Sequence, residues 1–309
     1  MPVSNSALRG LLGITHPILQ SGMGGVAGPE LVAAVSNAGG LGILAALNLR
    51  PEALRSGIEK VRELTDRPFG VNIWLHADVR TPVDVGRLDD DLVRGMQSVL
   101  NDYRPRHDLP PKLDRPPAPT DLVGPAIEVM LEERIPVFSA GLGIPETELT
   151  QRLHEHGTKV IAMVTSVADA LAAAAQGTDV VVVQGSEAGG HRSVGAKLPQ
   201  QQAVGGGLFT LLPEVIRRLA AAGTPVPVVA AGGIVDGRGL AAALVLGAQG
   251  ALLGTRFVAT QESQANDVWK QKLIGDHGET VVSDAFTGQW ARMLRTEFTD
   301  RWAESGRQA

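Results

Sequence analysis

The stretch Asp179-Val-Val-Val-Val-Gln-Gly-Ser-Glu-Ala-Gly-Gly-His191 contains the strand that decides how the rest of the chain folds. Its four consecutive valines show no polar alternation, which is typical of a strand buried on both faces of a parallel sheet. A glycine-rich loop follows and ends at His191. Ligands of α/β folds bind at the C-terminal edge of the sheet, where such a loop lies. His191 is therefore predicted to be a functional group, and the alternative is a solvated loop histidine.

On both sides of this stretch, short apolar runs that end in glycine alternate with helical patterns at βαβ spacing. Helices are predicted at 29–37, where Pro29 occupies the first turn, and at 51–64, where apolar residues recur every three or four positions. The predicted strands are 17–21, 41–44, 69–73, 136–139, 159–164, 179–184, 226–231 and 251–254. About eight strands, each but the last followed by a helix, predict a (β/α)8 TIM barrel. An open Rossmann sheet remains the alternative, because strand order cannot be read from one sequence.

Residues 76–120 interrupt this alternation after the third predicted strand. Prolines crowd the flanks of the segment, and its centre, residues 88–103, has the apolar stripe of a helix. We interpret it as an insertion that covers the barrel mouth, within a single domain of residues 1–309; a flexible linker is the alternative. Beyond Thr255, helices are predicted at 266–274 and 289–302, packed on the barrel wall or on the insertion.

The composition excludes several classes of function. The 309 residues are 44% hydrophobic with a formal net charge of −5, which favours a large core over disorder and gives no reason to expect nucleic acid. No cysteine is present, so disulfides, thiolate metal sites and cysteine nucleophiles are excluded. We find neither a signal peptide nor an apolar segment long enough for a membrane, and expect a soluble, cytoplasmic protein. Leu109 and Leu113 in the insertion could form a homodimer contact.

Glycines end the last two predicted strands. Gly232 and Gly233 follow the seventh strand, and Gly254 and Thr255 follow the eighth. In a barrel, the loops after these two strands form the common phosphate site, where bare backbone N–H groups face the anion. The pattern predicts a phosphorylated ligand, and the alternative is that the glycines only make tight turns.

A second group of candidate residues lies at the ends of other predicted strands. Gly22, Met23 and Gly24 combine small backbone with a thioether, which suits the flat face of an aromatic ring. Asn72 and Gln184 each offer a donor and an acceptor that could read the polar edge of such a ring. Together with the phosphate site, they indicate flavin mononucleotide (FMN). Met23 and Gln184 could as easily belong to the core and to a cap.

Five motifs together resemble the nitronate monooxygenase family, formerly called 2-nitropropane dioxygenases. They are Gln20-Ser-Gly-Met-Gly-Gly25, Phe69-Gly-Val-Asn72, Gln184-Gly-Ser-Glu-Ala-Gly-Gly-His191-Arg192, Ala230-Ala-Gly-Gly-Ile234 and Leu253-Gly-Thr-Arg-Phe257. The resemblance implies a TIM barrel with tightly bound FMN, no metal, and His191 as the catalytic group near the reactive edge of the flavin. It also implies which residues contact FMN, and we add the glycines beside them. The full set is Gly22, Met23, Gly24, Asn72, Gln184, Gly189, Gly190, Gly232, Gly233, Gly254 and Thr255.

The same resemblance implies a reaction. FMN-dependent oxidation of alkyl nitronates, such as propionate 3-nitronate, and in some cases of nitroalkanes, by O2 would give a carbonyl compound and nitrite. His191 could act neutral, as the base for a nitroalkane α-proton, or protonated, holding the nitro oxygens. Arg192 could attract an anionic substrate or form a surface salt bridge, and Glu187 is expected to be a solvent-facing carboxylate.

Three departures from the family pattern leave the substrate open. Ser193 stands where the family usually has glycine, the single tyrosine, Tyr103, lies in the insertion, and Gln289-Trp290 replaces a more usual Arg-Pro. One alternative is therefore an NAD(P)H-dependent FMN reductase that acts on a quinone or an enoyl-acyl carrier protein. Another is a barrel without flavin that binds a sugar phosphate or acts as an isomerase.

Overall fold

Eight parallel strands form one sheet in the computed structural model, which describes residues 7–76, 84–112, 114–117, 120–193, 204–275 and 278–305. They are β1 (Ile18–Gln20), β2 (Gly42–Ala45), β3 (Phe69–Ile73), β4 (Val137–Ala140), β5 (Lys159–Val164), β6 (Val180–Gln184), β8 (Val228–Ala231) and β9 (Gly250–Leu253). Their order is β1-β9-β8-β6-β5-β4-β3-β2, and a parallel bridge between Leu19 and Leu41 joins the two ends. The sheet therefore closes, which confirms the TIM barrel over the open Rossmann sheet.

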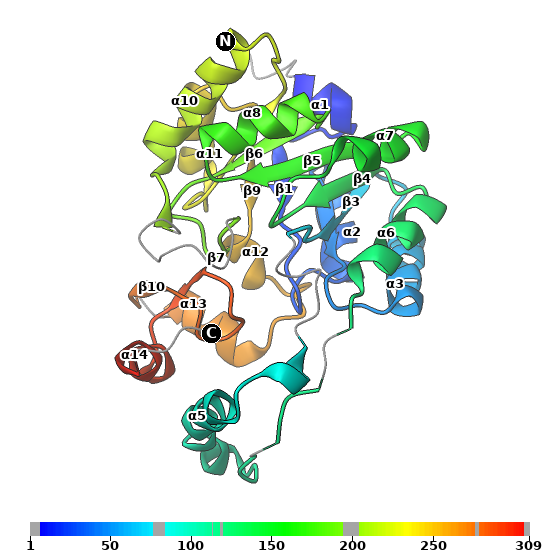
Figure 1. Ribbon diagram of the computed structural model, residues 1–309. Coiled ribbons are helices and arrows are strands. Elements are labelled where there is room, and N and C mark those ends of the chain that lie inside the picture. Colours follow the sequence, from blue (N-terminus) through cyan, green and yellow to red (C-terminus); the bar gives the residue numbers. More distant parts are fainter. Residues whose placement is uncertain are drawn as a thin grey trace.

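Helices surround the barrel and follow the predicted alternation (Figure 1). They are α2 (Pro29–Asn37), α3 (Pro51–Leu64), α6 (Val123–Glu132), α7 (Thr147–Glu155), α8 (Val167–Ala175), α10 (Leu208–Ala221) and α11 (Gly237–Val245). Both α2 and α3 begin at a proline, as predicted for Pro29, because the fixed φ of proline suits the first helical turn. A short helix, α1 (Ala7–Leu12), buries Leu8 and Leu12 in the cluster that fills the barrel interior.

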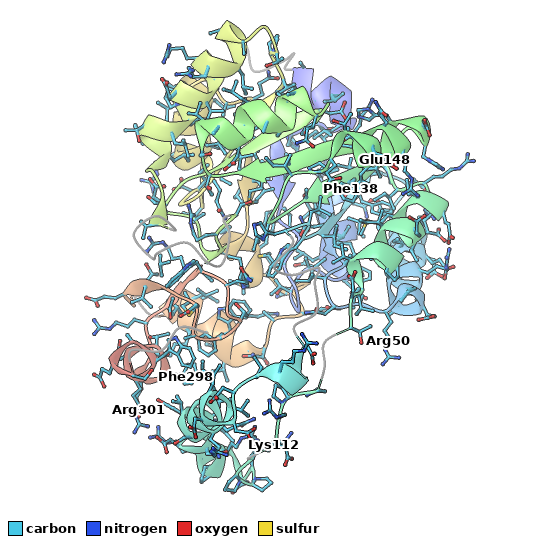
Figure 2. All side chains as sticks on the ribbon, viewed as in Figure 1. Arg50, Lys112, Phe138, Glu148, Phe298 and Arg301 are labelled. Carbon is cyan, nitrogen blue, oxygen red and sulfur yellow. The ribbon has the colours of Figure 1, made fainter. Side chains whose placement is uncertain are left out.

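The core has two layers, one inside the barrel and one between the sheet and its helices. Alternate residues of β6 enter each layer: Val180 and Val182 join the interior cluster, and Val181 and Val183 pack in the cluster with α8 and α10. Two strands along the sheet from β6, the fully buried Phe138 of β4 packs in the outer layer (Figure 2). Both faces of β6 are therefore buried, as its unbroken run of valines predicted.

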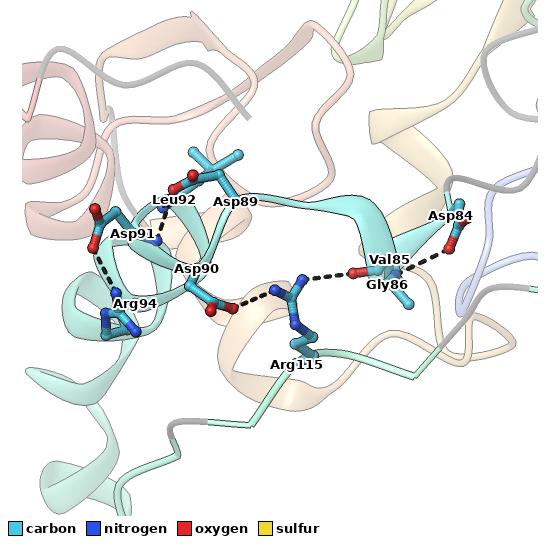
Figure 3. Close-up of polar contacts among 9 residues, drawn as sticks. All are labelled: Asp84, Val85, Gly86, Asp89, Asp90, Asp91, Leu92, Arg94 and Arg115. Atoms are coloured by element: carbon cyan, nitrogen blue, oxygen red, sulfur yellow. Dashed lines mark hydrogen bonds and ion pairs between the residues drawn. The ribbon is translucent and has the colours of Figure 1, made fainter.

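The insertion contains a helix at the predicted place. The described part of the insertion contains the 3-10 turn η2 (Val85–Arg87), the helix α5 (Asp90–Asn101) and the 3-10 turn η3 (Arg104–His107). The Asp89 side chain accepts hydrogen bonds from two N–H groups in the first turn of α5, as an N-cap does. Arg115, on the returning chain, donates to the Val85 carbonyl at 2.7 Å and also bonds Asp90, so the two arms of the insertion are tied together (Figure 3).

The C-terminal segment differs from the predicted pair of helices. Beyond α12 (Thr255–Val258) and the predicted α13 (Asp267–Gly275), β10 (Thr280–Ser283) and β11 (Ala291–Leu294) form a hairpin, and α14 (Glu297–Glu304) follows. The predicted helix over 289–302 is wrong in its first half. There β11 pairs with β7 (Gly190–His191), so its partner lies about a hundred residues away and leaves no local signal.

The insertion contacts the C-terminal segment. Arg106 pairs with Glu297 at 2.9 Å, and the rings of Tyr103 and Phe298 are 5.2 Å apart. Figure 1 shows α5 on the same side of the barrel as α13 and α14. That the insertion covers the barrel mouth stays a prediction. So does the homodimer contact, since Leu109 is exposed and Leu113 lies outside the described residues.

Within the described part of the chain, no helix combines the length and the apolar character that a membrane crossing needs.

Candidate active site

The candidate residues gather at the C-terminal ends of the barrel strands. Asn72 lies one residue before the end of β3, beside Ser139 of β4, and Gln184 ends β6 beside Ala231 of β8. Because parallel strands present their C-terminal ends at one edge, the loops that follow them surround a common centre. The predicted glycine loops and His191 all follow these ends.

The His191 backbone is fixed from two sides. On one side, β7 pairs antiparallel with β11, which sets His191 opposite Ala291. On the other side, Gln184 Nε2 donates to the His191 carbonyl at 2.8 Å, and Gln184 Oε1 accepts from the Ser193 N–H at 2.9 Å. The buried Gln184 carboxamide therefore holds the loop that carries His191, a role that the sequence did not predict.

The His191 ring contacts two side chains that sequence reasoning missed. Its Nε2 lies 2.8 Å from Thr287 Oγ1, in the turn between β10 and β11. Its centroid lies 4.6 Å from the Trp74 ring, at an interplanar angle of 62°. Burial lowers the pKa of His191 from its usual value of 6.5, because a charged ring is poorly solvated there. The neutral form therefore predominates at neutral pH.

Trp74 reaches His191 because two glycines leave space around the end of β3. A Cβ atom at Gly141 would lie 2.6 Å from Trp74 Cδ1, and a Cβ atom at Gly22 would overlap the Asn72 Cβ. The Asn72 amide donates to the Ser139 carbonyl at 3.1 Å and to the Ser139 hydroxyl at 3.0 Å. The wall formed by Asn72 and Trp74 is therefore held by β4.

The glycines after β1, β6 and β9 lie close together. A Cβ atom at Gly254 would lie 3.4 Å from Met23 Sδ, and one at Gly189 would lie 2.6 Å from Thr255 Oγ1. Gly24, in contrast, faces open space, since a Cβ atom there would meet no atom within 4 Å. The three loops therefore approach one another at positions where glycine leaves room for a neighbouring side chain.

The two glycines after β8 occupy positions where a side chain would be strained. Gly232 has φ +131° and Gly233 has φ +65°, in the region that other residues rarely adopt. A Cβ atom at Gly232 would also lie 3.1 Å from the Ala188 nitrogen, so the loops after β6 and β8 touch. Beside them Glu187 is exposed, as expected, but its carboxylate also accepts the Leu208 N–H at 3.0 Å and caps α10.

The expected surface salt bridge of Arg192 is wrong, and attraction of an anionic substrate stays a prediction. Its side chain is 1% exposed, and Nη1 donates to the Gly185 carbonyl at 2.6 Å, so it joins the two ends of the His191 loop. Burial and the neighbouring charge of Arg292 lower the pKa of Arg192 to about 10. Ser193, one departure from the family pattern, donates from its hydroxyl to the Met163 carbonyl at 2.9 Å.

The missed residues carried weak signals in the sequence. Trp74 follows the third predicted strand by one residue, within the same strand-end pattern as Asn72. Thr287 lies two residues before Gln289-Trp290, one of the departures from the family pattern. Because neither contact with His191 is local in sequence, only the fold brings these side chains to the ring.

The fold and the site define a (β/α)8-barrel protein with its candidate ligand site at the C-terminal ends of the strands. The family model of nitronate monooxygenase matches residues 5–309. A probable nitronate monooxygenase from Staphylococcus saprophyticus is 36% identical over 302 residues, which cover 97% of this chain and 81% of the relative. The chain belongs to the nitronate monooxygenase family, a family of oxidoreductases.

Solved structures agree with this assignment. A nitroalkane oxidase from Streptomyces ansochromogenes superposes with a TM-score of 0.84 at 35% identity, covering 98% of this chain and 83% of that one. FabK from Thermotoga maritima gives a TM-score of 0.74 at 36% identity, covering 97% and 78%. The enoyl reductase domain of MlnA from Bacillus amyloliquefaciens, 14% identical, has a TM-score of 0.67 and shares the fold.

Proposed function

We propose that this protein is an FMN-dependent nitronate monooxygenase. It would oxidise alkyl nitronates, and nitroalkanes after loss of their α-proton, with O2 to a carbonyl compound and nitrite. The observation that carries the proposal is a partly buried His191 of lowered pKa, beside a cradle of glycines at the strand ends of a chain in this family. The similarity to a protein named nitroalkane oxidase supports nitroalkanes as substrates.

The residues at the strand ends fit FMN. A phosphate needs several N–H donors at close range, and the glycines after β8 and β9 offer bare backbone beside the Thr255 hydroxyl. A flat ring needs a floor without side chains, and Gly24 beside Met23 matches that need, because a Cβ atom there would meet no atom within 4 Å. When FMN is bound, it supplies the electron transfer that links nitronate oxidation to the reduction of oxygen.

The chain's own part would be binding, orientation and proton control. A neutral His191 can take the α-proton of a nitroalkane, which a protonated ring cannot do, so the lowered pKa favours the role of base. Gln184 would hold the His191 backbone, and Trp74 would limit the movement of its ring. Asn72 and Gln184 would contact the polar edge of the flavin.

His191→Asn tests the proposal, with flavin content and nitrite formation as the two readouts. We expect a yellow variant that keeps its flavin and whose turnover of a nitroalkane falls by about 100-fold or more. His156→Asn is the matched control, since His156 is exposed at the end of α7 and bonds the Arg152 carbonyl. Full flavin loading together with full turnover in His191→Asn would contradict the proposal.

The two alternatives give different outcomes in the same preparation. A barrel without flavin would be colourless after purification. A reductase that acts on a quinone or an enoyl thioester would bleach rapidly on addition of NADH or NADPH without air, whereas the proposed enzyme would not.

A further inference from the structure

Thr287 is the side chain that hydrogen-bonds the His191 ring. Thr287 Oγ1 and His191 Nε2 are 2.8 Å apart. A hydroxyl donates one hydrogen and accepts through its lone pairs, and in a neutral imidazole one nitrogen donates while the other accepts. The direction of this hydrogen bond therefore decides which ring nitrogen carries the proton.

The surroundings of Thr287 favour one direction. The Gln289 carbonyl oxygen lies 3.4 Å from Thr287 Oγ1, where it can accept the hydroxyl hydrogen. The Gln289 N–H donates to Thr287 Oγ1, also at 3.4 Å. With its hydrogen directed to Gln289, the hydroxyl can only accept from His191. Nε2 is then the protonated nitrogen, and the lone pair of the neutral ring is on Nδ1.

The turn that carries Thr287 is well fixed. The N–H groups of Thr287 and Gly288 both donate to the Asp284 carbonyl, at 3.2 and 2.9 Å. Gly288 has φ +71°, which favours glycine. The buried Asp284 side chain accepts from Trp302 Nε1 at 2.9 Å, which anchors the turn on α14. Since β11 of the same hairpin pairs with His191, one unit fixes both the backbone and the ring of this residue.

We propose that Thr287 is a positioning residue that holds neutral His191 in its Nε2–H tautomer, so that Nδ1 is the atom that accepts the α-proton of a nitroalkane. This inference rests on the proposed function. In the step, the C–H bond breaks, its electron pair stays with the substrate as the nitronate anion, and the proton moves to Nδ1. Both ring nitrogens then carry hydrogen, and Thr287 Oγ1 accepts from Nε2 before and after the transfer.

The test is 15N NMR of the flavin-loaded protein with labelled histidine at pH 8, where His191 is neutral. His191→Asn identifies its signals among the seven histidines. We expect a protonated Nε2 and a bare Nδ1 in the wild type and in Thr287→Ser, which keeps the hydroxyl. Thr287→Val keeps the branched shape and should give a mixture of tautomers. Thr210→Val is the matched control, because the Thr210 hydroxyl bonds the Gly207 carbonyl on the exposed start of α10.

A wild-type His191 protonated on Nδ1 would overturn the inference, as would a Thr287→Val spectrum that equals the wild type. In kinetics, we expect kcat for a nitroalkane to fall about five- to tenfold in Thr287→Val, the factor that one ordinary hydrogen bond carries. Turnover of a preformed nitronate, which needs no proton removal, should change less. The tautomer is read without substrate, so a failure of the proposed function and a failure of this inference are distinguishable.

Discussion

Gln184 Nε2 donates a hydrogen bond of 2.8 Å to the carbonyl oxygen of His191, while Gln184 Oε1 accepts from Ser193 at 2.9 Å. One buried side chain at the end of β6 therefore holds the loop on both sides of Arg192. A loop held in this way can fix the position of a ring as rigidly as a strand can, because its backbone polar groups are satisfied by a fixed partner.

Gln184→Glu should destabilise the protein and lower its turnover. The carboxylate can still accept from Ser193, but its second oxygen faces the His191 carbonyl without a hydrogen to donate. We expect a loss of about 1–3 kcal/mol in the free energy of unfolding, measured by urea titration. Gln151→Glu, on the exposed face of α7, should change it by less than about 0.5 kcal/mol. Equal stability of the two variants would disprove this role of Gln184.

Arg192→Lys should also destabilise the protein, although it keeps the positive charge. Lysine cannot reproduce the planar fork that reaches the Gly185 carbonyl from a buried position. We expect a loss of about 1–3 kcal/mol in the free energy of unfolding. Arg217→Lys, in an exposed pair with Glu214, should stay within about 0.5 kcal/mol. If Arg192 acted through charge alone, Arg192→Lys would keep both stability and turnover.

The pH dependence should show the lowered pKa of His191. Turnover of a nitroalkane should rise with pH through an apparent pKa below 6.5 and then level off, since the base is the neutral ring. Unfolded His191 binds its proton more readily than folded His191. Its contribution to stability is therefore complete above pH 6.5 and is lost as the pH falls through the folded pKa.

The measurements are an initial-rate pH profile and thermal unfolding of the wild type and His191→Asn between pH 5 and 8. His191→Asn should lose less stability at the acid end than the wild type does. A profile with an apparent pKa above 6.5 would argue against the burial of a neutral base.

Gly141→Ala should displace Trp74 from His191. The new Cβ would lie 2.6 Å from Trp74 Cδ1 and 3.0 Å from its Nε1, so the indole must move. We expect a loss of about 1–3 kcal/mol in the free energy of unfolding and a change in tryptophan fluorescence. The control is Gly124→Ala in α6, where a Cβ atom meets nothing within 4 Å and alanine should stabilise the helix. Unchanged fluorescence in Gly141→Ala would show that Trp74 does not pack there.

Loss of the aromatic contact between the insertion and α14 should loosen the insertion more than loss of the ion pair between them. Phe298 packs against Tyr103 of the insertion, against Phe286 beside Thr287, and against Trp302. The Arg106–Glu297 pair is exposed, and such pairs contribute little. Phe298→Ala should therefore speed hydrogen exchange in α5 several-fold. Glu297→Gln, which leaves Arg106 over the Tyr103 ring, should leave it nearly unchanged. The reverse order would show that the charge pair holds the insertion.

The sequence was sufficient for the barrel because its signals are local. The valine run of β6, the prolines at the starts of α2 and α3, and the glycines at strand ends each report on a few neighbouring residues. Repeated at βαβ spacing, such signals leave few folds to choose from.

The parts that the sequence did not predict depend on contacts between distant residues. The strand β11 was taken for helix because its partner, His191, is a hundred positions earlier. A surface salt bridge was one expectation for Arg192, because arginine is usually exposed, and only the closed loop shows that it is 1% exposed. The contacts of the His191 ring with Thr287 and Trp74 likewise arise from three separate segments.

The central claim is that a flavin in this barrel is reduced by a nitronate, and an anaerobic absorbance titration tests it most directly. Purified protein would be titrated without air with propionate 3-nitronate in one cuvette and with NADH or NADPH in another. We expect the nitronate to change the flavin spectrum and neither NADH nor NADPH to change it. Rapid bleaching by NADH or NADPH, with no response to the nitronate, would contradict it and would indicate a reductase.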